Sequence, residues 1–289
     1  MPPSTPLSTE AFFLSLFLLM LIGGWCIGVL GGVLGVGGGV FLIPFLVEFV
    51  GLTPLESVGL SLLCVIGTSV GSSSRALRST DVNIGLGFIV EVCMVVGSVG
   101  AALVASRMSS VWLLRLFGLL TGSLALLFVW RAMRPAPACP PTSDAAAHWL
   151  DGEVVEPGCA PARYRLQRPV LSSVMVLGTG VASGLFGIGG GMLNVPILSV
   201  VGRIPLRAAA ATSAFAMALS GAAGAAVHVS NGTVPVLLSV PLLVGVIPGG
   251  RSGTLLQAKF TTRTLQLLFA ALAAAVGAWS IWRSFTGAT

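Results

Sequence analysis

Long apolar stretches separated by short polar segments run along most of this 289-residue chain. Each approaches the length of about 20 apolar residues that a helix needs to span a bilayer. The stretches lie near residues 12–34, 36–50, 57–74, 84–106 and 111–130, and then near 170–186, 188–202, 208–227, 234–257 and 264–282. They are continuously apolar and lack the alternation of barrel strands. We therefore predict an all-α polytopic integral membrane protein.

Composition strengthens this prediction. Hydrophobic residues make up 55% of the chain, charged residues only 8%, and the mean hydropathy is +1.00. Soluble domains contain about 25% charged residues. No Lys or Arg precedes Arg75, so the first apolar stretch lacks the basic start of a signal peptide. We expect that stretch to be a structural segment of the protein.

One glycine-rich pattern occurs twice. GVLGVGGGVFLIPFL runs from Gly32 to Leu46, and GLFGIGGGMLNVPIL runs from Gly184 to Leu198. Both fit G-x-x-G-x-G-G-G-x-x-x-x-P-x-L, and a duplicated, glycine-broken helix is typical of secondary transporters. The long polar stretch between the copies contains every acidic residue that follows Glu91. We predict a first membrane repeat at 11–134, a cytoplasmic linker at 135–168 and a second membrane repeat at 169–285.

The basic residues predict how the glycine pattern is threaded through the membrane. An unbroken helix over 12–50 would be about 58 Å long, about twice the hydrocarbon thickness. If the chain turns back at the glycines, twelve of the 15 basic residues share one face, opposite Arg107, Arg115 and Arg283. Positive residues favour the cytoplasmic face. We therefore predict two inverted repeats, each with a glycine-broken returning helix pair plus three spanning helices, and both termini extracytoplasmic.

The glycines offer an anion site that needs no charged side chain. We place the structural break at Gly35 and Pro44 in the first pattern and at Gly187 and Pro196 in the second. A helix that restarts after such a break presents unpaired amides and the positive end of its dipole, which bind anions. Close helix packing, as in G-x-x-x-G interfaces, is the alternative use of the glycines. The predicted substrate-binding glycines are Gly37, Gly38, Gly39, Gly189, Gly190 and Gly191.

The doubled pattern and its surroundings resemble the sulfite exporter TauE/SafE family of membrane permeases, of the 4-toluene sulfonate uptake permease type. The resemblance covers both repeats. It includes Leu60-Ser61-Leu62 and Gly67-Thr68-Ser69 after the first pattern, Ala211-Thr212-Ser213 after the second, and His228 with Asn231-Gly232-Thr233-Val234. It implies secondary transport of sulfite, sulfonates or related organosulfur compounds across the bacterial cytoplasmic (inner) membrane.

Polar side chains near the patterns are further candidates for substrate contact. The candidates are Asn194, Ser61, Thr68, Thr212, Ser213 and Arg251. Asn194 stands where the first pattern has Leu42, so its amide either contacts the anion or caps the backbone. The Ser and Thr hydroxyls either line the same cavity or bond within their own helices. Arg251 either contacts the anion near the cytoplasmic mouth or extends its side chain to the interface.

Two titratable residues are candidates for proton coupling. Glu91 lies alone in an apolar stretch, where a carboxylate is costly and usually functional. His228 has a side chain that changes charge near physiological pH. For both residues, a position at the membrane interface is the alternative.

We predict a secondary transporter of small sulfur-containing anions, with a passive anion channel as the alternative. The chain has two histidines and no cluster of nucleophile and base within the apolar stretches, so we predict that it is not an enzyme. Its five cysteines form no C-x-x-C pair, and we expect no cofactor and no bound metal. We expect no nucleic-acid partner.

Overall fold

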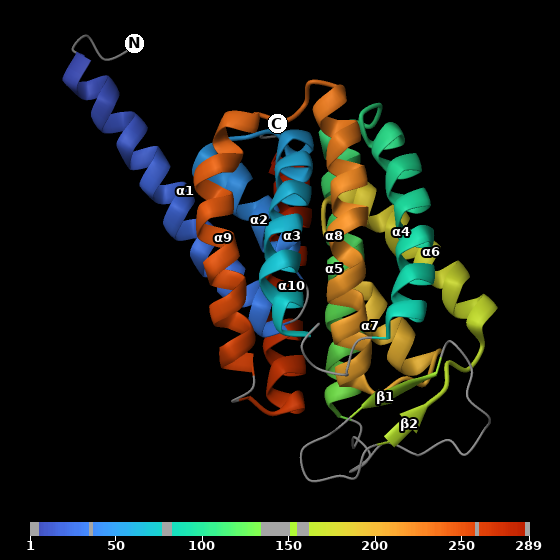
Figure 1. Ribbon diagram of the computed structural model, residues 1–289. Helices are drawn as coiled ribbons and strands as arrows, with labels where there is room; N and C mark the ends of the chain where they lie inside the picture. The colour runs from blue at the N-terminus through green and yellow to red at the C-terminus, as the bar shows by residue number, and fades with distance from the viewer. Residues whose placement is uncertain are drawn as a thin grey trace.

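Helices form nearly all of the computed structural model (Figure 1), which describes residues 6–34, 37–76, 83–133, 151–154, 162–257 and 260–286. The first half contains α1 (Pro6–Leu34), α2 (Gly39–Phe45), the π-helical η1 (Leu46–Val50), α3 (Pro54–Ala76), α4 (Ile84–Ala105) and α5 (Ser110–Ala132). The second contains α6 (Pro169–Phe186), α7 (Gly191–Val200), α8 (Leu206–Ser230), α9 (Val236–Gln257) and α10 (Thr262–Thr286). Among the described residues, eight helices are long and apolar enough to cross a membrane. The predicted all-α polytopic membrane protein is confirmed.

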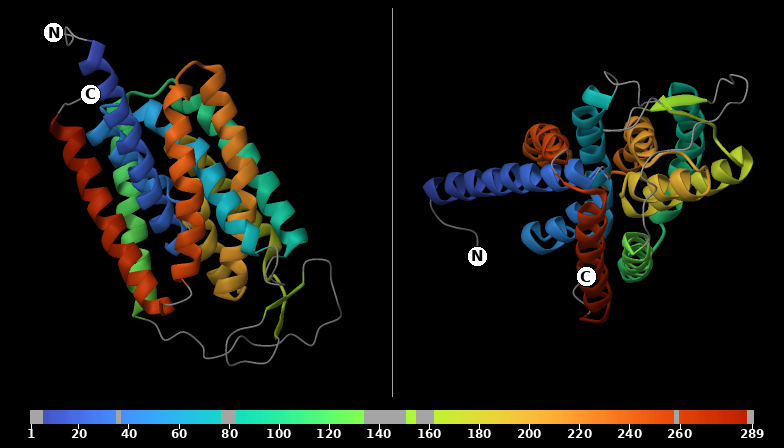
Figure 2. Two further views of the ribbon diagram at one scale, coloured as in Figure 1. Left: turned by 60° about the vertical axis from the view of Figure 1, so that its left-hand side comes forward. Right: turned by 90° about the horizontal axis from the view of Figure 1, so that it is seen from below.

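The two halves contain their helices in the same order, and the first helix of each half packs against the other half. Each half has one long helix, then a short one, then three long ones. The first helix α1 packs along α9, and its counterpart α6 packs along α4, the counterpart of α9. The counterparts α3 and α8 contact each other, as do α5 and α10. Figure 2 shows the resulting single bundle, with the beginning of α1 leaning away from it.

Glycines allow these first helices to approach their partners closely. A Cβ on Gly28 of α1 would lie 2.6 Å from the carbonyl oxygen of Val246 on α9. Likewise, a Cβ on Gly180 of α6 would lie 2.5 Å from the carbonyl oxygen of Met94 on α4. Such close backbone contact is common between membrane helices. The hydrophobic effect does not drive helices together in lipid, and small residues allow close van der Waals packing instead. Gly184, the first glycine of the second pattern, packs in the same way against Ser98.

The chain turns back after α1. A Cβ on Gly31 would touch Gly38, and one on Gly23 would touch the Phe45 ring, so α2 runs back along α1. Figure 1 shows that α3 then begins near the end of the bundle from which α1 starts. The predicted returning helix pair is present in the first half, and α6 and α7 contact each other at the corresponding place in the second.

Counterpart helices run antiparallel. Gly118, near the start of α5, packs against Ile281, near the end of α10. At the other end of the same pair, the ring centroids of Phe128 and Phe269 are 4.3 Å apart. An inverted repeat requires counterparts of opposite direction, as these are. The inverted relation of the complete halves stays a prediction, as do the membrane orientation and the three domain boundaries.

A short β-hairpin, which the sequence analysis did not predict, lies inside the expected linker. Strands β1 (Gly152–Val154) and β2 (Ala162–Tyr164) pair antiparallel, and Arg163 forms a 2.7 Å ion pair with Glu153. Asp151 bonds to Arg165 at 3.0 Å, and this hydrogen bond raises the pKa of the Arg165 guanidinium. Tyr164 and Leu166 are buried in a cluster with residues of α7 and α8. The hairpin is therefore docked on the second half of the bundle.

Candidate functional site

Both helices break at the glycines. Gly37 and Gly38 have φ of 79° and 74°, in the left-handed region that favours glycine, and α2 begins at Gly39. Gly187, Gly189 and Gly190 have φ of 65°, 71° and 77°, and α7 begins at Gly191. The candidate break residue Gly35 lies outside the described residues. Each short helix therefore starts from a left-handed turn, where its first amides have no intrahelical partner.

The two breaks meet at α3. The Ser61 hydroxyl donates to the carbonyl oxygens of Gly39 at 3.1 Å and Gly187 at 2.8 Å, so one side chain joins both breaks. The Thr68 hydroxyl donates to the carbonyl oxygen of Gly37 at 2.8 Å. Both residues are fully buried or nearly so. The predicted candidates Ser61 and Thr68 thus contact the glycine backbone, while Thr68 also bonds within its own helix to Val65.

Close packing at the breaks leaves no room for larger residues. A Cβ on Gly39 would overlap the Gly187 carbonyl oxygen, and one on Gly189 would overlap the Val65 side chain. Val65 is completely buried and lies against both breaks. The first break also faces the Met217 sulfur, 3.4 Å from where a Gly37 Cβ would stand. Glycine is therefore required at the breaks, because other residues rarely adopt these positive φ angles and because a Cβ would overlap neighbouring atoms.

Asn194 is completely buried, and both ends of its amide have neighbours. Its Oδ1 accepts a 2.5 Å hydrogen bond from the Thr179 hydroxyl on α6, and its Nδ2 lies 2.7 Å from the sulfur of Met94 on α4. Met94 in turn lies over Gly190, where its methyl group occupies the space of a Cβ. Asn194 thus links α7 to α6 and α4 within this structure.

The remaining hydroxyl candidates lie on α8. Thr212 and Ser213 are both fully buried. The Thr212 hydroxyl accepts a long 3.4 Å hydrogen bond from the Asn83 amide. The Ser213 hydroxyl has no hydrogen-bond partner among the described residues. Neither hydroxyl is bonded to a glycine break.

The charged candidates lie apart from the breaks. Arg251 has an exposed side chain, although its neighbour Gly250 packs against Thr68. Glu91 is half-buried on α4, with its carboxylate bonded to the backbone of Leu219 on α8. His228 is fully buried, with Nε2 3.4 Å from the Gly184 carbonyl oxygen.

The prolines have different consequences in the two short helices. Pro44 lies inside α2, and the helix widens into η1 immediately after it. A proline removes an intrahelical hydrogen bond, which accounts for the looser winding that follows. Pro196 lies inside α7, which continues as an α-helix to Val200.

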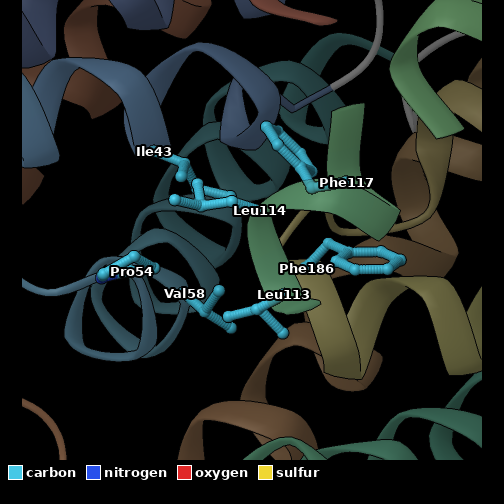
Figure 3. A pocket seen from close by; sticks show the side chains of 7 residues that line it. All are labelled: Ile43, Pro54, Val58, Leu113, Leu114, Phe117 and Phe186. Carbon is cyan, nitrogen blue, oxygen red and sulfur yellow. The ribbon is translucent and has the colours of Figure 1, made fainter. Parts of the chain in front are cut away.

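A small apolar pocket lies beside the second break (Figure 3). It is lined by Ile43, Pro54, Val58, Leu113, Leu114, Phe117 and Phe186. These residues come from α2, α3, α5 and α6. No lining side chain is polar, so the pocket offers nothing that would hold a small inorganic anion. In the part of the chain that the structure describes, no group of three metal-ligating side chains gathers.

Sequence reasoning missed several residues at the breaks. Val65, Met94 and Met217 are ordinary apolar residues in apolar stretches, and nothing in the sequence distinguishes them. Thr179 could have been identified, because it is a hydroxyl residue on the helix that leads into the second pattern, shortly before Gly184. Glu48 was also missed, although it is a carboxylate within an apolar stretch. It accepts a 2.8 Å hydrogen bond from Trp279 and forms a 3.3 Å ion pair with Arg283.

Comparisons with known proteins agree with this architecture. A family model described as "Sulfite exporter TauE/SafE" matches residues 20–280. The probable membrane transporter protein YunE of Bacillus subtilis is 27% identical over 259 residues, covering 87% of this chain and 92% of its own length. A probable membrane transporter protein of Xylella fastidiosa (strain 9a5c) is 29% identical over 279 residues, with 93% and 96% covered.

A probable membrane transporter protein of the archaeon Methanocaldococcus jannaschii is 24% identical, again with 93% and 96% covered. These names describe membrane transport, not catalysis, and none names a channel. No solved structure gives a significant match. The duplicated glycine breaks, the apolar helices and the match along most of the chain lead to one conclusion. The chain is a multi-pass membrane transporter and belongs to the sulfite exporter TauE/SafE family.

Proposed function

We propose that this transporter is a secondary carrier of small sulfur-containing anions, such as sulfite or organic sulfonates. The observation that carries the proposal is the meeting of the two glycine breaks at Ser61, whose hydroxyl bonds to both. The family description, "Sulfite exporter TauE/SafE", supports this substrate class. The names of the relatives do not favour a passive channel, so we propose a carrier.

The chemistry of the breaks supports an anionic substrate. The helix over residues 39–50 and α7 both begin at the junction, and helix beginnings carry partial positive charge. The side chains that lie against the breaks are uncharged: Ser61, Val65, Thr68, Met94, Asn194 and Met217. In a site of low polarity, amide donors bind an anion more strongly than they do in water. Sulfur oxyanions present several acceptor oxygens to such donors.

Access to the junction requires movement. The two breaks pack against each other and are covered by Val65 and Met94. We infer that this arrangement is an occluded state of the carrier. The substrate would reach the amides when one half rocks against the other, as transporters with inverted repeats do. The antiparallel counterparts α5 and α10 support an inverted relation of the halves.

We also propose how the carrier is energised and oriented. Glu91 and His228 are the candidates for proton coupling, since Glu91 is the one carboxylate in the long apolar helix α4 and His228 the one imidazole in α8. The family supports a location in the bacterial cytoplasmic membrane, and the distribution of basic residues supports an orientation with both termini outside. The hairpin β1–β2 would then lie on the cytoplasmic face.

Flux measurements test this function. The full chain is reconstituted in proteoliposomes and presented with sulfite, thiosulfate, sulfate, sulfoacetate or taurine. We expect at least one sulfur compound to accumulate above its equilibrium level when a proton gradient is imposed. Flux of a sulfur anion that only ever runs downhill would contradict the carrier. A failure of every sulfur compound, with transport of another anion, would contradict the substrate class.

A further inference from the structure

Arg115, near the beginning of α5, has no part in the proposed transport site. Its side chain is half-buried between aromatic rings. The guanidinium carbon lies 5.7 Å from the Trp112 ring centroid and 5.3 Å from that of Phe285 on α10. Its Nε is buried and has no hydrogen-bond partner among the described residues. Because the Arg115 side chain is half-exposed and its guanidinium makes no ion pair among the described residues, its remaining N–H groups can donate to an acceptor from outside the protein.

The charge of Arg115 is uncompensated within the described residues. Arg283, two residues before Phe285 on α10, forms its ion pair with Glu48. Glu48 also accepts the hydrogen bond of the Trp279 indole, so its carboxylate is already engaged. Arg115 therefore contributes one positive charge that no carboxylate among the described residues compensates, which suits a singly charged anion.

The surroundings of Arg115 indicate where that anion comes from. Trp112, Trp282 and Phe285 are 58%, 61% and 74% exposed, although all three are large and apolar. They lie where α5 begins and α10 ends, close to the ends of two candidate membrane spans. Aromatic residues gather at this depth, at the level of the lipid headgroups. Arginine side chains near span ends likewise extend toward the headgroups.

We propose that the surface around Arg115, between the start of α5 and the end of α10, binds the headgroup phosphate of an anionic phospholipid. The Arg115 guanidinium donates to the phosphate oxygens, and Trp112 and Phe285 pack against the glycerol and the upper acyl chains. Guanidinium groups bind phosphate through paired, charge-assisted hydrogen bonds. Free phosphate shares the acceptor chemistry, but it has no apolar part to cover the exposed aromatic rings. The site is independent of the transport proposal and can be tested without a substrate.

The test compares lipid binding by the full chain and its variants. Purified protein in detergent is titrated with phosphatidylglycerol, phosphatidylcholine or sodium phosphate, and bound lipid is counted by native mass spectrometry alongside the thermal unfolding midpoint. We expect Arg115→Gln to weaken phosphatidylglycerol binding about tenfold, the effect of one charge-assisted hydrogen-bonded contact. Arg115→Lys retains the charge without the planar fork and should lose less.

Arg107→Gln is the matched control, because Arg107 is exposed between α4 and α5 and has no aromatic contact of this kind among the described residues. It should bind phosphatidylglycerol as the native protein does. An equal loss in both Gln variants would overturn the site, as would unchanged binding by Arg115→Gln. A rise in the unfolding midpoint with sodium phosphate equal to that with phosphatidylglycerol would overturn the assignment to a lipid. Phe285→Ala, which leaves Arg115 intact, should weaken lipid binding without creating a response to free phosphate.

Discussion

The two glycine breaks follow the same pattern but are supported in different ways. The second break is held from within, since Asn194 on α7 is bonded to Thr179 on α6. The first pattern has Leu42 at the equivalent place and makes no such bond. Instead, the end of its short helix is held from outside, where Glu48 in η1 meets Trp279 and Arg283 of α10. Val200 occupies the position equivalent to Glu48 in the second half.

We infer from this difference that the two breaks differ in rigidity. A polar contact buried beside the glycines fixes the beginning of α7, which is the end that would face an anion. The contact of Glu48 with α10 holds only the later part of the first short helix. The glycines before that helix and at its start are bonded to Ser61 and Thr68 instead. We therefore expect the second break to be the more rigid half of the junction and the first break to move more during transport.

The largest effect is expected where the breaks touch. Gly39→Ala places a Cβ on the Gly187 carbonyl oxygen, which neither backbone can avoid. Overpacking of this kind costs about 1–3 kcal/mol, so we expect transport to fall about tenfold or more and the unfolding midpoint to drop. Gly178→Ala on α6 is the control, because a Cβ there meets nothing within 4 Å. Equal activity of the two variants would show that the breaks are not in contact.

The next effect concerns the hydroxyl that joins the breaks. Ser61→Ala leaves the Gly39 and Gly187 carbonyl oxygens without this donor, at a cost of about 1–3 kcal/mol. Ser57→Ala is the control on the same helix, since the Ser57 hydroxyl bonds only to Thr53 one turn earlier. Thermal unfolding and initial transport rates should both distinguish the two variants. If Ser57→Ala proved as damaging, the bridge would have no special role.

A smaller effect separates the two breaks from each other. Asn194→Leu gives the second pattern the residue of the first and removes the bond to Thr179. The side chains have similar volume, so we expect a loss of about 1 kcal/mol, or about fivefold in substrate affinity. Ligand-dependent thermal shifts measure this affinity. Leu42→Gln, a polar change at the matching position of the first break, tests the converse, and identical losses in both would remove the proposed asymmetry.

The smallest effect is expected at Glu48, which connects the short helix of the first break to α10. Glu48→Gln removes the ion pair to Arg283, whose side chains are 36% and 24% exposed. Partly exposed pairs contribute about 0.2–1 kcal/mol, and salt screens them. The unfolding midpoint should fall slightly at low salt and less at high salt. A salt-independent loss would mean that Glu48 acts through its hydrogen bond with Trp279 alone.

Much of the fold could be predicted because apolar length and glycine spacing are local properties. The apolar helices of the described residues, the two breaks and the chain reversal follow from stretches that each contain their own signal. The packing of α1 on α9 could not be predicted, since it depends on which glycine faces meet. The hairpin could not be predicted either, because three-residue strands carry almost no pattern.

The backbone of the candidate site and its polar side chains Ser61, Thr68 and Asn194 were predictable, but its apolar side chains were not. Glycine spacing identified Gly37, Gly189 and Gly190, whose dihedral angles other residues rarely adopt. The side chains against them depend on tertiary packing, so Met94 carried no sequence signal. Arg251 shows the opposite case. Its charge within an apolar stretch marks it as a candidate for substrate contact, which stays a prediction, and its exposed position depends on which side of α9 faces the bundle.

The packing of each first helix against the other half also constrains the order in which the protein can assemble during synthesis. The glycine face of α1 packs on α9, which is synthesised only after α1 through α8. Until then, α1 must wait in the membrane with that face against lipid or a temporary partner. The complementary pair forms earlier, because α4 is already present when α6 emerges. Assembly should therefore begin with the α4–α6 pair and close with α9, so a chain truncated before α9 would leave its first helix without its main partner.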